Sequence, residues 1–235
     1  MQLAEELLLL LTDDQTGRMS VPERLLDIAV AGGALSELGA YEVVRVVKDG
    51  ETIPGSFGEP VAPGRLAIDP DVTPPKSAVL DQTLEVFRGM QGRKLTNVLP
   101  IMGRALYPTL HRTLQSAGVV TRDAPAPQSS MFPQTTWKTV DASHEKAVRS
   151  HIADVLLHGA APDDRARHLI GLLEATRTLF VAMPELVPDS GSDAASEHTA
   201  AEDTVLARAR EVRALTDPDG PCGAVLAAVD TLVTR

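Results

Sequence analysis

The chain has 235 residues and a formal net charge of −10, and aromatic residues make up only 3% of it. A chain of this length can bury a sizeable core, which must here be built from aliphatic side chains. The negative charge disfavours nucleic acids as partners, since neutralisation of phosphates supplies most non-specific affinity. The single cysteine, Cys222, cannot form an internal disulfide, so the sequence indicates no oxidising compartment.

The first forty residues predict two packed helices. A leucine block at 7–11 is too short to cross a bilayer, which takes about 20 apolar residues. The polar segment 12–18 that follows predicts a turn. The next helix, at about 23–38, is apolar on nearly every side, and a helix that is hydrophobic all round must be buried. We therefore expect a mainly α-helical bundle around this central helix.

The rest of the chain predicts more helices and one or two short β-hairpins. The valine-rich segment 41–47 predicts a strand that pairs with a second one at 65–68, and residues 119–140 predict another hairpin. Further helices are expected at about 77–90, 93–117, 143–157, 163–180, 200–215 and 223–233, with breaks or kinks at Pro100, Gly103 and Pro108. Residues 188–199 predict a mobile loop within one domain, 1–235.

The sequence shows no familiar catalytic or metal-binding motif. Its six histidines lack the spacing of metal ligands, and phosphate loops, nucleophile elbows and dinucleotide fingerprints are missing. We therefore expect no enzyme activity, no metal and no cofactor. Since we find no signal peptide and no transmembrane run, we expect a cytoplasmic protein whose membrane contact is peripheral, at the inner face.

Basic residues gather in one part of this acidic chain. They are Arg93, Lys94, Arg104, His111, Arg112 and Arg122. A helix would bring Arg104, His111 and Arg112 near one face. Because guanidinium groups bind phosphate through paired hydrogen bonds, the cluster is a candidate site for an anionic ligand. The alternative interpretation is an ordinary solvated helix face.

Five blocks of residues occur in order along nearly the whole chain. They are Glu6-Leu7-Leu8-Leu9-Leu10 with Asp14 and Gly17; Gly32, Leu35, Glu37 and Leu38; Pro74 with Leu80-Asp81-Gln82-Thr83-Leu84; Leu114 with Gly118-Val119-Val120; and Asp163, Arg165, Leu169, Ile170, Leu172 and Ala175. Together they resemble the Golgi phosphoprotein 3 family, including its bacterial relatives. The Arg- and Ala-rich, Lys-poor composition is also typical of a high-GC bacterial genome. The resemblance implies a mostly helical domain with a protruding hairpin.

The resemblance also implies a ligand. Eukaryotic members of this family are peripheral membrane adaptors that bind phosphatidylinositol 4-phosphate and the cytoplasmic tails of glycosyltransferases. Their headgroup pocket uses one aromatic residue, one arginine of the second helix and two basic residues three apart. By position these fall at Pro22, Ala31, Arg104 and Tyr107, so this chain keeps one of the four.

The expected activity is therefore non-enzymatic binding to anionic, phosphoinositide-like lipid headgroups. Arg104 is the first candidate for the headgroup site, and Arg112, Arg18 and Arg24 are further candidates for the same basic surface. The lost contacts leave the identity of the lipid open.

The hairpin offers a second kind of contact. Phe132 and Trp137 form an apolar edge suited to a membrane interface, a protein partner or self-association through the 119–140 hairpin. The alternative is that both side chains pack the hairpin onto the domain. An intracellular protein–protein interaction or adaptor module without lipid binding is accordingly the alternative function.

Overall fold

The computed structural model of the protein describes residues 1–123, 136–187 and 195–234. Helices dominate these ranges. They are α1 (Leu3–Leu10), α2 (Glu23–Ala40), α3 (Ala78–Arg88), α4 (Leu95–Ser116), α5 (Ser143–Leu157), α6 (Asp164–Ala175), α7 (Leu179–Ala182), a 3-10 turn (Pro184–Leu186), α8 (Ala195–Arg213) and α9 (Pro221–Val233). The predicted class, mainly α with short hairpins, is confirmed.

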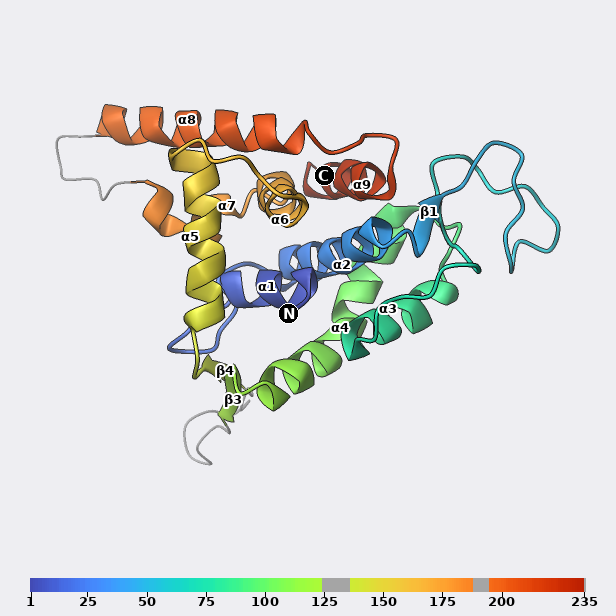
Figure 1. The fold of residues 1–235 in the computed structure, drawn as a ribbon, viewed down its shortest axis with the longest axis horizontal. Helices are drawn as coiled ribbons and strands as arrows, with labels where there is room; N and C mark the ends of the chain where they lie inside the picture. Colours follow the sequence, from blue (N-terminus) through green and yellow to red (C-terminus); the bar gives the residue numbers. More distant parts are fainter. Residues whose placement is uncertain (124–135, 188–194, 235) are drawn as a thin grey trace.

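Helix α2 is the centre of the bundle, as predicted from its sequence. Every residue from Leu26 to Leu38 is buried. The helix packs against α1, α3, α4, α6 and α9. Figure 1 shows it between an upper layer, made of α6, α8 and α9, and the α3–α4 pair below. The leucine block of α1 lies beside it and is also buried, because an all-apolar surface has no stable place in water.

The close crossing of α2 and α4 depends on one glycine. A Cβ atom on Gly103 would lie 2.0 Å from the backbone oxygen of Asp27. The missing side chain lets the two helix backbones approach each other, and this sets the position of everything that α4 carries. Breaks or kinks were predicted at Pro100, Gly103 and Pro108. No break occurs there, because α4 is one helix from Leu95 to Ser116 with both prolines inside it.

Two small antiparallel sheets complete the described fold. Strands β1 (Val44–Val46) and β2 (Leu66–Ile68) pair with Val44 opposite Ile68. Strands β3 (Val120–Asp123) and β4 (Thr136–Thr139) pair with Arg122 opposite Trp137. The β3–β4 sheet follows α4 directly and lies beyond the C-terminal end of this helix (Figure 1). The tip of this hairpin, with Phe132, lies outside the described residues.

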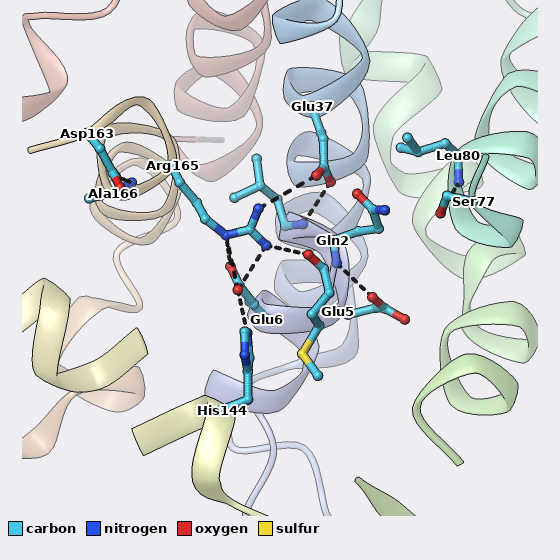
Figure 2. A network of polar contacts seen from close by, with 12 residues as sticks. Gln2, Glu5, Glu6, Glu37, Ser77, Leu80, His144, Asp163, Arg165 and Ala166 are labelled. Carbon is cyan, nitrogen blue, oxygen red and sulfur yellow. Dashed lines mark hydrogen bonds and ion pairs between the residues drawn. The ribbon is translucent and has the colours of Figure 1, made fainter. Parts of the chain in front are cut away.

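Buried ionic contacts tie the N-terminal helix to three other helices (Figure 2). Glu6 of α1 accepts a hydrogen bond from Arg165 of α6 at 2.9 Å and lies 2.7 Å from the His144 ring nitrogen of α5. Arg165 also approaches Glu37 of α2. The Glu37 carboxylate accepts a hydrogen bond from the Leu3 amide at 2.8 Å. Burial raises the pKa of the Glu37 carboxyl group. The network fixes α1 against the bundle, and α1 in turn supports the loop at residues 12–18.

The remaining differences from the sequence-based expectations lie near helix ends. The helix expected at 163–180 is two helices, because Arg177 adopts a left-handed conformation (φ 57°) between α6 and α7. The helix expected from residue 200 begins at Ala195. Residues 188–194 of the expected mobile loop lie outside the described residues. Within the described ranges, no helix is both long and apolar enough to cross a membrane.

Candidate functional site

The outer face of α4 is basic. From residue 86 to residue 122 the chain has no aspartate or glutamate but six arginines and lysines, although the whole chain carries a net charge of −10. Leu99, Met102 and Leu106 face the core and are fully buried. Arg104 and Arg112 lie on the opposite, exposed side of the helix, and Ile101 is 58% exposed there. The helix thus presents two guanidinium groups and an exposed apolar side chain one turn before the first of them.

A cavity of about 550 Å³ opens beside the middle of α4. We call it the aromatic cavity. Its walls come from α1, the loop after α1, the start of α2, α4 and β4. The lining residues are Leu8, Thr12, Gly17, Arg18, Met19, Glu23, Leu26, Tyr107, His111, Thr136 and Trp137.

The loop after α1 reaches this cavity because Gly17 allows a close approach to β4. Gly17 has a φ of +63°, and a Cβ atom there would lie 2.6 Å from backbone atoms of Trp137. The Thr139 amide donates to the Asp14 carbonyl oxygen at 3.1 Å, which fastens the same loop to the hairpin. Any residue with a side chain at position 17 would push the loop away from the strand.

Three aromatic rings line one side of the cavity. The His111 ring stacks on Trp137 with centroids 4.6 Å apart and 5° between the planes, and Tyr107 lies 6.3 Å from His111. Burial lowers the pKa of His111 to about 4, so its ring is neutral at physiological pH. The buried Nδ1 atom of His111 has no hydrogen-bond partner among the described residues. A donor from a bound molecule or water would satisfy it.

Acidic groups lie directly behind this aromatic wall. Asp27 of α2 is almost fully buried, and burial raises the pKa of its carboxyl group. Burial also raises the pKa of the Tyr107 hydroxyl, and the negative charges of Asp27 and Glu23 raise it further. Arg104 compensates in part, since its guanidinium lies 3.4 Å from Asp27 and 3.7 Å from Glu23.

The structure separates the four arginines that the sequence suggested as one basic surface. Arg18 lines the aromatic cavity. Arg104 lies one helical turn before Tyr107, on the outer face, where two acidic residues contact it. Arg112 donates to the Thr109 hydroxyl at 3.1 Å and makes no ion pair with a described residue. Arg24 points elsewhere and donates to the Leu232 carbonyl oxygen at the end of α9.

The other predicted positions are explained by burial. Ala31 is fully buried inside α2, so the chain has neither a charge nor room for one at that position. Pro22 precedes α2 at the surface. Trp137 stacks on His111 in the cavity wall. Sequence reasoning missed Glu23 and Met19 as cavity residues. An acidic residue such as Glu23 is common in the first turn of a helix, where it interacts with the helix dipole, so its position indicated no binding site.

A second cavity, of about 380 Å³, lies between α6, α8 and α9. Its acidic residues, Glu174 and Asp230, are bound by Arg213, and Arg210 lies 3.4 Å from Glu174. These ion pairs give the groups a structural role in joining three helices. The aromatic cavity, whose buried histidine nitrogen lacks a partner, is therefore the stronger candidate site.

The sequence of the chain matches a known protein family. A search of curated proteins found no match. The family model for Golgi phosphoprotein 3 (GPP34) matches residues 3–217, which is nearly the whole chain and includes every element around the aromatic cavity. The chain therefore belongs to the Golgi phosphoprotein 3 (GPP34) family.

Proposed function

We propose that this protein is a non-enzymatic, peripheral membrane-binding protein that recognises anionic, phosphoinositide-like phospholipid headgroups at the cytoplasmic face of a membrane. The observation that carries the proposal is the outer face of α4. There Arg104 and Arg112 lie exposed on a 22-residue helix without a single acidic residue, in a chain that is otherwise strongly acidic.

Electrostatic attraction would hold this face to an anionic surface. A basic residue near such a surface contributes about 1 kcal/mol, an attraction that fades within a Debye length. Ile101 lies one helical turn before Arg104 and is exposed, so it can enter the interface, where burial of apolar area adds to the attraction. The contacts of Arg104 with Glu23 and Asp27 reduce its share, so Arg112 and the basic residues flanking α4 carry more of the attraction.

The buried acidic groups support the non-enzymatic part of the proposal. Perturbed pKa values often mark catalytic residues. Here the three buried carboxyl groups with raised pKa values, Asp27, Glu37 and Glu145, each lie against an arginine of another element or turn. Their partners are Arg104, Arg165 and Arg149, respectively. Burial raises each of these pKa values and the neighbouring arginine opposes the rise, so each shift has a structural cause.

Vesicle co-sedimentation tests the proposal. Vesicles of phosphatidylcholine alone would be compared with vesicles that also contain phosphatidylglycerol or phosphatidylinositol, at low and at high salt. We expect tighter binding to the anionic vesicles than to phosphatidylcholine alone, and a smaller difference between the two at high salt. The Arg104→Gln/Arg112→Gln variant should lose up to about 30-fold in affinity, at about 1 kcal/mol for each charge.

A matched variant controls for net charge. Arg208→Gln/Arg210→Gln removes two charges from α8, and Arg210 resembles Arg104 in being well exposed and 3.4 Å from an acid. This control should bind as the unaltered protein does. Equal losses in both variants, or no binding of the unaltered protein at low salt, would refute the lipid proposal and favour a protein-interaction module.

A further inference from the structure

The aromatic cavity differs in charge from the outer face of α4. Among the described lining residues, only two carry a full charge at neutral pH, the exposed cation Arg18 and the exposed acid Glu23. His111 is neutral there. Arg18 makes no ion pair with a described residue. Within the described ranges, Glu23 pairs only with the exposed Arg104, at 3.7 Å, and such exposed pairs contribute little. The cavity therefore offers one positive and one negative group to a ligand.

The negative end of the cavity coincides with its aromatic wall. Tyr107 lies beside the Asp27 carboxyl group, and both Asp27 and Glu23 act on the tyrosine hydroxyl with negative charge. Aromatic faces attract alkylammonium groups, and tryptophan and tyrosine do so most strongly. Trp137 and Tyr107 are both in this wall. An ammonium group would therefore be stabilised by the rings and by Glu23 together.

A polyanionic headgroup fits the same cavity poorly. It would find one guanidinium, that of Arg18, and would place further phosphate oxygens against Glu23 with Asp27 behind it. Two of the basic positions of the related headgroup pocket are occupied here by Tyr107 and the buried Ala31. The cavity's volume of about 550 Å³ is ample for a glycerophosphate ester with a small amine.

We propose that the aromatic cavity binds an alkylammonium phosphodiester, the chemistry of a phosphoethanolamine or phosphocholine group. The ammonium lies against Tyr107, Trp137 and Glu23, and the phosphate lies beside Arg18. The same chemistry occurs in phospholipids and in their soluble glycerol esters. The membrane source rests on the function proposed above, whereas the selectivity of the cavity does not.

The single tryptophan of the chain reports on this cavity directly. Trp137 is the only tryptophan in the sequence, so a change in its fluorescence on titration marks binding at this wall. The probes are glycerophosphoethanolamine and glycerophosphocholine. Glycerophosphoglycerol serves as the matched probe, because it has the same phosphodiester without the ammonium. We expect the two ammonium probes to bind about tenfold more tightly than glycerophosphoglycerol.

Two variants separate the contributions of the two charges. Glu23→Gln should abolish most of the preference for the ammonium probes, and Arg18→Gln should weaken all three probes to a similar extent. Glu59→Gln, which removes an exposed acid from the β1–β2 loop, is the control and should change nothing. Circular dichroism would confirm that each variant is folded.

The outcomes distinguish this inference from the proposed function. Equal affinity for all three probes, no binding by fluorescence and calorimetry, or a Glu23→Gln variant with unchanged preference would overturn the inference. In each of those cases vesicle binding through α4 would still stand on its own test. If the soluble probes bind with the expected preference and no vesicle does, the inference holds with a soluble ligand and the membrane function fails.

Discussion

Arg165 of α6 donates to the Glu6 carboxylate of α1 at 2.9 Å, and the Glu6 side chain is almost completely buried. Arg165 also donates to the Met1 carbonyl oxygen at 2.6 Å. These contacts hold the N-terminal helix in place. Because the loop after α1 forms one wall of the aromatic cavity, the stability of that wall depends on an ion pair far along the chain.

Replacing Arg165 should therefore be costly. Arg165→Met leaves the Glu6 carboxylate buried without its cation, and removal of one partner from a buried pair costs about 3–5 kcal/mol. Urea unfolding would measure the loss. Arg167→Met is the control, since Arg167 pairs with the exposed Asp164 and should cost no more than about 1 kcal/mol. Similar losses in the two variants would mean that the Glu6 network is not a main support of α1.

The crossing of α2 and α4 makes a second prediction. Gly103→Ala would place a Cβ atom 2.0 Å from the Asp27 carbonyl oxygen, so the two helices must separate. We expect a loss of roughly 1–3 kcal/mol in the free energy of unfolding. Gly171→Ala is a matched control in α6, where the nearest atom would be 3.4 Å away. That change should be neutral or stabilise by up to about 1 kcal/mol, because alanine favours helix. If Gly103→Ala leaves the free energy of unfolding unchanged, α2 and α4 do not depend on the close approach at Gly103.

His111 makes stability depend on pH. Its pKa is about 4 in the folded protein, because burial disfavours the charged ring, and about 6.5 in an unfolded chain. As the pH falls below about 6.5, the unfolded chain takes up this proton first, so stability declines until the pH reaches the folded-state pKa. At about pH 5 the loss should be about 2 kcal/mol.

Two variants isolate this contribution. His111→Phe keeps an aromatic ring against Trp137 but cannot titrate, so its stability should fall less between pH 7 and about pH 5 than that of the unaltered protein. His158→Gln, at an exposed position, should leave the difference unchanged. Identical pH profiles for the unaltered protein and His111→Phe would show that the imidazole of His111 is not desolvated.

The sequence predicted the architecture because its strongest signals are signals of burial. An all-apolar helix at 23–38 has only one stable place, and α2 occupies it. Local signals also mark helix ends, since Ser77 caps α3 with its side chain and the left-handed Gly118 follows α4. Arg177 carried no such signal. Arginine is common inside helices, so nothing in the sequence indicated that Arg177 adopts a left-handed backbone conformation and that α6 ends before it.

The candidate site was less predictable because it depends on distant contacts. The sequence placed Arg104 on a basic helix, but its two acidic neighbours come from α2, across the crossing that Gly103 permits. Likewise, Trp137 meets His111 only because the loop at Gly17 docks on β4. No periodicity or spacing along the chain encodes such encounters.

The proposal that the outer face of α4 binds anionic membranes is tested most directly by asking which face of the molecule enters a membrane. An environment-sensitive fluorophore would be attached to Ile101→Cys or to Leu215→Cys, each in a Cys222→Ser background. The two native side chains are similarly exposed, 58% and 56%, and lie on α4 and in the segment between α8 and α9, respectively. With anionic vesicles, we expect a blue shift for the label at position 101 and none at position 215. A shift at 215 alone, or no shift at either position, would contradict the proposal.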